Sequence, residues 1–202
     1  IKDGTIARTD LTPFHARQAL ALNDEKLTAR LKEIWGELRQ SDATKKKRIE
    51  ELHETLGKDV RDKADLPAGR VLFQNLCATC HILYGEGGKL GPDLTGSGRA
   101  DLGYLLENIV DPSAIVPAEY RMTILKLKDG RSLTGVIASS TDRTVTLRSL
   151  AQEATLEKSG IAETSQLPNS IMPAGLLSAL TPWQIRDLIA YLMHPEQVPL
   201  KK

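Results

Sequence analysis

The feature that most constrains this chain is a short cluster that holds both of its cysteines and one of its four histidines. Cys77 and Cys80 are separated by two residues, and His81 follows directly. Two cysteines so close together cannot link distant segments in the way of a small disulfide scaffold. Three kinds of chemistry use such a cluster: half of a zinc site, a redox dithiol, and covalent attachment of a haem.

The surrounding residues favour one of these three. A structural zinc site needs four ligands, and the sequence has no second cysteine pair to complete it. A thioredoxin-type dithiol is expected within a βαβ unit, whereas the cluster is preceded by a helical pattern and followed by the glycine-rich "GEGGKLGPDLTGSGR". A c-type haem needs two thiols for its vinyl groups and an adjacent imidazole for the iron. Cys77, Cys80 and His81 meet both demands, so we predict one covalently attached haem c with His81 as an axial ligand.

Two further groups are expected around this haem. A ligating histidine is oriented through its second ring nitrogen, and the rigid backbone at Pro92 in "GPDLTG" makes its carbonyl a natural acceptor, although Gly91-Pro92 alone would be merely a turn. The propionates also need donors. Arg99 is preferred because it ends the glycine-rich loop; otherwise it would be a solvated loop arginine. The other candidates are Tyr84, Tyr104 and Trp183.

The second axial ligand is sought among the three methionines and the remaining histidines. Met172 lies in "LPNSIMPAGLL", which is too rich in Pro and Gly for a helix or strand, so core packing explains it poorly. A thioether on such a loop suits haem iron. We predict Met172 as the ligand opposite His81, with packing on the haem edge as the alternative. Ordinary structural roles are favoured for the others: Met122, Met193, His15, His53 and His194.

The spacing of the two predicted ligands indicates an insertion. Met172 lies 91 positions after His81, more than a compact single-haem protein needs. The β-branched runs "YRMTILKL", "SLTGVIASS" and "TVTLRSL", separated by the turn sequences "KDGR" and "STDR", predict a small β-barrel or curled sheet there. Helical periodicity elsewhere predicts a helical hairpin over 24–57, a helix leading to Cys77, and a final helix that begins with a capping box at Thr181.

Several segments resemble known haem proteins. "GRVLFQNLCATCH", "GPDLTG" and "LIAYL" resemble class I cytochrome c. A longer set is similar to the Pirellula/Verrucomicrobium-type haem-binding domain over roughly residues 67–195: "GEGGKLGPDLTGSGR", "YLLENIVDPSAIV", "LKDGRSLTGVI" and "SIMPAGLLSALTPWQIRDLIAYLM". In that family the domain is commonly the C-terminal module of large exported, dehydrogenase-like proteins. The resemblance implies electron transfer, and Met172 matches the methionine of the family's Ser-x-Met-Pro pattern.

The predicted fold is mainly α: a cytochrome c-type helical haem domain with an inserted small β-barrel or curled sheet and an N-terminal helical hairpin. We expect the two ends of the insertion to lie close together, and the final helix to cross the helix before Cys77, with Gly69 against Tyr191. The predicted units are an N-terminal helical segment at 1–66, haem-attachment core at 67–116, β module at 117–166, and axial-methionine loop with C-terminal helix at 167–202.

We therefore expect a single-haem electron carrier rather than an enzyme. Its donor would be a dehydrogenase domain or protein, and its acceptor another cytochrome or an oxidase. Because bacteria attach haem c outside the cytoplasm, a periplasmic or otherwise exported protein is expected. A net charge of +1 and the lack of an apolar run of about 18 residues argue against nucleic acid and a membrane span. The start at Ile1, without a leader, suggests a mature chain or a piece of a longer one.

Two other hypotheses stay open. If Met172 were labile or absent from the iron, a small gas or a peroxide could bind the open position. The β module could also serve as a docking surface for a partner or for a parent dehydrogenase.

Overall fold

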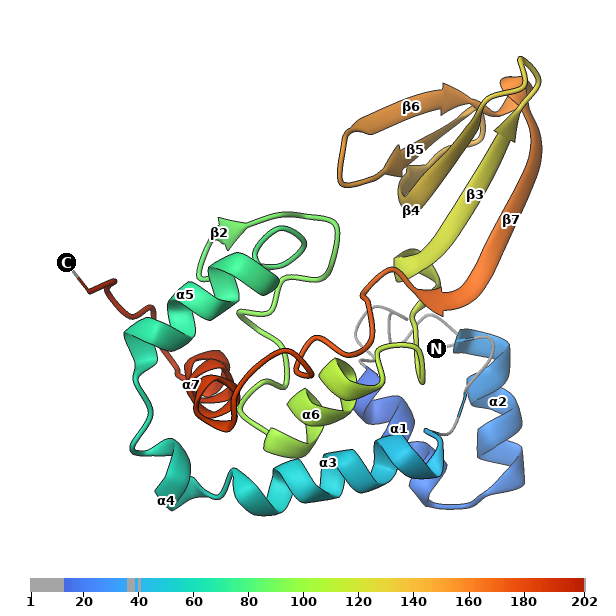
Figure 1. Ribbon diagram of the computed structural model, residues 1–202. Helices are drawn as coiled ribbons and strands as arrows, with labels where there is room; N and C mark the ends of the chain where they lie inside the picture. The colour runs from blue at the N-terminus through green and yellow to red at the C-terminus, as the bar shows by residue number, and fades with distance from the viewer. Residues whose placement is uncertain (1–12, 36–38, 40, 202) are drawn as a thin grey trace.

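The chain folds into a helical part and a separate sheet (Figure 1). The computed structural model describes residues 13–35, 39 and 41–201, so the first part of the helical segment predicted at 1–66 lies outside the described residues. Helices make up 39% of the structure and strands 23%, which is an α/β composition. The prediction of a mainly α, cytochrome c-type fold is therefore wrong. The five-stranded antiparallel sheet gives the molecule more strand than a mainly α fold has.

Two crossing helices form the centre of the helical part. Helix α5 (Leu66–Leu76) leads to the cysteine cluster, and α7 (Pro182–Met193) begins with the predicted capping box. A Cβ on Gly69 would lie 2.1 Å from the Asp187 carbonyl oxygen and 2.7 Å from the Tyr191 Cβ. The absence of a side chain at Gly69 is thus what lets the two backbones approach. The predicted contact between Gly69 and Tyr191 is confirmed.

The main hydrophobic core surrounds this crossing. Helix α6 (Leu102–Val110) packs on α7, and α3 (Ala43–Thr55) packs on α6. The Tyr191 ring is 1% exposed and lies 5.8 Å, between centroids, from that of Phe73. Other members of the core are Leu52, Leu56, Leu83, Leu102, Leu105, Leu106, Leu177, Ile185, Leu188, Ile189, Leu192 and Val198.

The N-terminal helices pack differently from the prediction. Helix α2 (Glu25–Trp35) packs against α1 (Pro13–Ala21), whereas α3 turns away and continues through the short α4 (Lys58–Arg61). The helical hairpin predicted over 24–57 is therefore wrong. Helix α3 packs on α6 instead, where Leu52 and Leu56 join the main core and the Lys45 ammonium lies 2.6 Å from a carboxylate oxygen of Asp111, at the end of α6.

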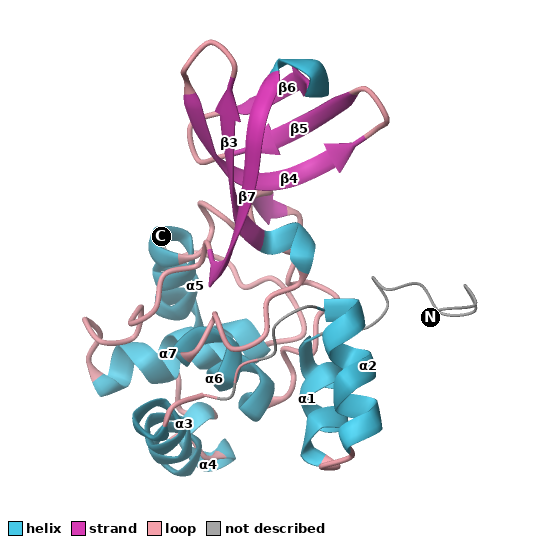
Figure 2. Cartoon of the chain, turned by 90° about the vertical axis from the view of Figure 1, so that its right-hand side faces the viewer, coloured by secondary structure: helices cyan, strands magenta, loops and turns pink. Residues whose placement is uncertain are grey.

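The β segment forms one antiparallel sheet in the order β6-β5-β4-β3-β7. Its own apolar core contains Leu125, Leu127, Val145 and Leu147. Figure 2 shows the strands twisting across one another above the helices. The strands are β3 (Arg121–Leu127), β4 (Ser132–Ser140), β5 (Thr144–Arg148), β6 (Glu153–Glu157) and β7 (Ile161–Ser170), with 3-10 turns at Ala118–Tyr120 and Lys158–Gly160.

The two ends of the sheet segment meet, as predicted. Arg121 at the start of β3 pairs with Ser170 at the end of β7. Strand β7 continues past the predicted boundary at 166 and includes Pro168. A proline is tolerated there because β7 is an edge strand with β3 as its neighbour in the sheet.

Candidate functional site

The cysteine cluster forms a tight turn at the end of α5. The Cys77 N–H donates to the Phe73 carbonyl at 2.8 Å, which closes the helix. The Cys77 carbonyl then accepts from the N–H groups of Cys80 at 3.0 Å and His81 at 2.9 Å. Both cysteines are free thiols and half-buried. One turn of chain therefore carries both thiols and the imidazole of His81.

A glycine-rich loop packs tightly over this turn. It begins with the small hairpin of β1 (Ile82–Leu83) and β2 (Glu86–Gly87). The Gly88 N–H donates to the Ala78 carbonyl at 2.7 Å, and a Cβ at Gly88 would lie 2.1 Å from the Thr79 carbonyl oxygen. Gly87 has a φ of 123°, and a Cβ there would lie 2.1 Å from the His81 carbonyl oxygen. Glycine is required at both positions for the loop to cover the cluster.

The His81 ring is held in one orientation. Its Nδ1 lies 2.9 Å from the Pro92 carbonyl oxygen, which only accepts hydrogen bonds, so Nδ1 carries the proton and donates it. The neutral ring therefore has its free lone pair on Nε2. A Cβ on Gly91 would lie 2.5 Å from the His81 Cε1. The structure thus brings together His81 and the predicted acceptor Pro92, with Gly91 leaving room for the ring.

The pKa directions at the cluster favour its neutral forms. Burial lowers the pKa of His81, and the hydrogen bond to Pro92 acts in the opposite direction. Burial raises the pKa of Cys77 to about 12, with a smaller contribution from Cys80, whose own pKa is also raised by burial. A neutral imidazole is the form that binds a metal. Reactive dithiols instead have a lowered thiol pKa, so these cysteines lack the electrostatic setting of a redox dithiol.

A zinc site is not supported by the surroundings of the cluster. The described residues include both cysteines and all four histidines, and they contain no group of three or more Cys, His, Asp or Glu side chains placed to hold a metal ion. The donor set is therefore two thiols and one oriented imidazole. This set matches what a c-type haem requires of the protein.

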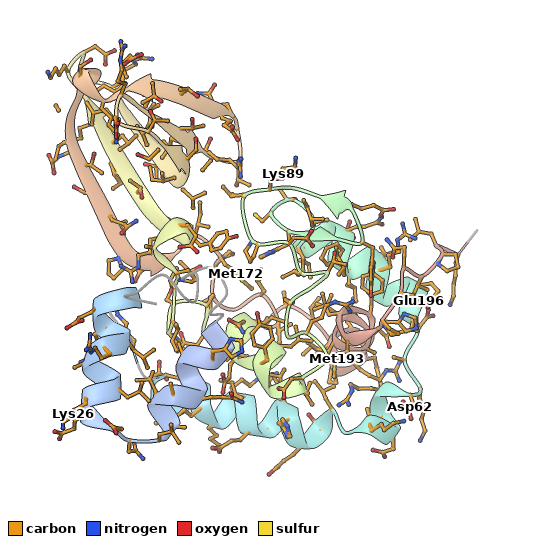
Figure 3. The ribbon with its side chains drawn as sticks, turned by 180° about the vertical axis from the view of Figure 1, so that it is seen from behind. Lys26, Asp62, Lys89, Met172, Met193 and Glu196 are labelled. Carbon is orange, nitrogen blue, oxygen red and sulfur yellow. The ribbon has the colours of Figure 1, made fainter. Side chains whose placement is uncertain are left out.

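Met172 lies on the loop between β7 and α7, and it is half-buried. Its backbone N–H donates to the Ser170 hydroxyl at 3.1 Å. Figure 3 shows Met172 near the base of the sheet, apart from Met193 on α7. Met193 packs against the main core, and Met122 is a half-buried residue of β3. The role of Met172 as an iron ligand stays a prediction.

Arg99 is more deeply placed than a loop arginine would be. It is 7% exposed, and its Nη1 donates to the carbonyls of Leu192, at 2.8 Å, and His194 at the end of α7. Its Nε donates to the Thr95 carbonyl at 3.3 Å, and its guanidinium carbon lies 4.9 Å from the centroid of the Tyr84 ring. These contacts anchor the glycine-rich loop on the C-terminus of α7, where a cation is favourable. A propionate role for Arg99 stays a prediction.

Sequence reasoning missed this anchoring role of Arg99, and it missed the serine that contacts the Met172 loop. Ser113, in "DPSAIV", accepts a hydrogen bond from the Ser170 N–H at 3.1 Å. Both contacts join segments far apart in the chain, so local periodicity and turn chemistry carry no signal for them. Among the remaining histidines, His15 and His53 are exposed helical side chains.

Comparison with known proteins adds no family: no protein-family model matches the chain, and a search of the curated proteins gave no significant match. Among the described helices, none combines the length and apolar character needed to cross a membrane.

Proposed function

We propose that this chain carries one covalently attached haem c and transfers electrons one at a time. The observation that carries the proposal is the pairing of His81 with Pro92, which leaves Nε2 unprotonated on the same turn as two free thiols. The resemblance of the sequence to class I cytochrome c over this region also supports it. When bound, the haem would supply an iron centre that accepts and releases one electron.

Each residue of the cluster would have a distinct task. The thiols of Cys77 and Cys80 would hold the haem through thioether bonds, and His81 would bind the iron through Nε2. The Pro92 carbonyl would fix the ring plane and raise the basicity of the ligand. Met172 would supply a second ligand to the iron, and a His/Met pair of ligands raises the reduction potential. The protein itself would make or break no bond in a substrate.

The proposal extends to partners and location. The electron donor would be a dehydrogenase domain or protein, in the same polypeptide or separate, and the acceptor another cytochrome or an oxidase. Because bacteria attach haem c outside the cytoplasm, we place the protein in the periplasm or another exported compartment.

The test is to express the full chain in cells that mature c-type cytochromes and to measure its mass and optical spectrum. One haem per chain that survives denaturation, with a low-spin spectrum, is expected. His81→Ala should abolish the low-spin spectrum, whereas His53→Ala, which changes an exposed helical histidine, should leave it intact.

Folded protein without covalent haem in such cells would contradict the proposal. Rapid formation of a full carbon monoxide complex by the ferrous protein at neutral pH would instead support the alternative function, in which Met172 is labile and a small gas or a peroxide binds the iron.

A further inference from the structure

The loop that carries Met172 is connected to the helical part through two serines in series. The Met172 N–H donates to the Ser170 hydroxyl at 3.1 Å, and the Ser170 N–H donates to the Ser113 hydroxyl at 3.1 Å. Ser170 ends β7, whereas Ser113 lies 57 positions earlier, just after α6. We call this chain of hydrogen bonds the serine relay. Through it, the helical part can fix the position of the Met172 loop.

The segment on which the relay ends is firmly held. Asp111, two residues before Ser113, is buried and pairs with Lys45 of α3 at 2.6 Å. The Ala114 carbonyl, one residue after Ser113, accepts from the Arg39 N–H at 2.9 Å. Ala114, Ile115 and Val116 are all buried. Ser113 therefore lies in a segment whose residues on both sides are held in place by polar contacts and burial.

The opposite end of the relay lies at one of the irregular places in the sheet. Arg121 pairs with Ser170, but the register of β3 against β7 shifts between Arg121 and Thr123. Such an irregularity leaves the end of a strand less strongly specified by its ladder. The position of Ser170 thus depends on its hydrogen bond to Ser113 as well as on the sheet.

We propose that Ser113 and Ser170 are positioning residues that hold the Met172 thioether on the iron. This inference rests on the proposed function. Without one of these hydroxyls, the backbone N–H of Ser170 or of Met172 would lose its acceptor. The Met172 loop would then gain freedom, and the thioether would spend less time on the iron. The β module would then have a role in the haem site: its last strand ends at the residue that sets the second axial ligand.

The experiment compares haem-loaded wild type with Ser113→Ala and Ser170→Ala. Loss of the net stabilisation that one hydrogen bond provides corresponds to about a fivefold rise in the fraction of protein molecules whose Met172 thioether is off the iron. The rate of carbon monoxide binding to the ferrous protein should rise by a similar factor. The thioether-to-iron band of the ferric protein should weaken, and the midpoint potential should fall. Ser113→Thr and Ser170→Thr keep a hydroxyl and should restore wild-type values.

Ser165→Ala is the matched control, because Ser165 is on the same strand and its hydroxyl donates to the exposed Glu163. It should leave all three readouts unchanged. If both alanine variants of the relay behave like this control while wild type shows the band, the inference is overturned. If wild type has no covalent haem, the proposed function fails instead. Should Ser170→Ala fail to fold, Ser113→Ala, outside the sheet, decides alone.

Discussion

Replacing Gly91 with alanine gives a sharp test of the His81 site, because the structure shows what the added methyl group meets. The new Cβ would lie 2.5 Å from Cε1, 2.8 Å from Nδ1 and 3.1 Å from Nε2 of the imidazole. All three distances are shorter than an ordinary van der Waals contact of a Cβ atom, which is 3.4–4 Å. The ring would have to move, and its hydrogen bond to Pro92 would lengthen or break.

The size of the effect follows from these two changes. Overpacking a buried site costs about 1–3 kcal/mol, and loss of a neutral hydrogen bond costs about 0.5–1.5 kcal/mol. The lower chain entropy of alanine in the unfolded state offsets about 0.4–1 kcal/mol. We therefore expect Gly91→Ala to lower the free energy of unfolding of the haem-free protein by roughly 1–3 kcal/mol, from these same contributions.

Urea unfolding and NMR titration of His81 measure the two parts of this prediction. The pKa of His81 should move up toward its ordinary value of 6.5 as the ring becomes more exposed, because burial affects this pKa more than the Pro92 hydrogen bond, whose loss acts in the opposite direction. Gly96→Ala is the control, because Gly96 lies in the same loop and a methyl group added there would have no heavy atom within 4 Å. A Gly91→Ala protein as stable as Gly96→Ala, with an unchanged His81 titration, would refute the reasoning.

Three further predictions concern neighbouring groups. Because burial lowers the pKa of His81 below 6.5, the folded haem-free protein binds fewer protons than the unfolded chain just below that pH. Its stability should therefore fall as the pH drops through this window, and urea titrations of His81→Gln should lack that fall. At about pH 8, alkylation followed by mass mapping should modify Cys80 before Cys77, whose pKa is raised to about 12; equal rates would contradict this. Arg99→Gln should lower the unfolding free energy by about 2–3 kcal/mol, since the α7 carbonyls lose a charged donor. An unchanged haem content in that variant would show that Arg99 serves the helix, whereas lost haem would support the propionate role.

Local chemistry explains what could be predicted from the sequence. The turn at Cys77 to His81, the acceptor at Pro92 and the capping box at Thr181 each depend on residues within about a dozen positions of one another. Their interactions are specified by backbone geometry and side-chain type. The Gly69 contact with Tyr191 was also predictable, because a glycine inside a helix is unfavourable unless it lets another backbone pass close by.

The features of the fold that the sequence did not predict depend on long-range packing. Strand β7 extends to Ser170, past the predicted end of the β module at 166, and its last residues have the composition of a loop until they pair with β3. Helix α3 packs on α6, where Leu52 and Leu56 join the main core and Lys45 pairs with Asp111, 66 positions further along the chain. Periodicity shows that a helix has an apolar face, but it does not show which other face covers it.

The sequence by itself therefore determined the chemistry of the turn from Cys77 to His81, since that chemistry lies within one turn of chain. Only the tertiary structure decided that Arg99 closes the end of α7 and that Ser113 supports the Met172 loop. The physical reason is that a hydrogen bond between distant segments leaves no periodic trace in the sequence. It exists only after the hydrophobic core and the sheet have brought its two ends together.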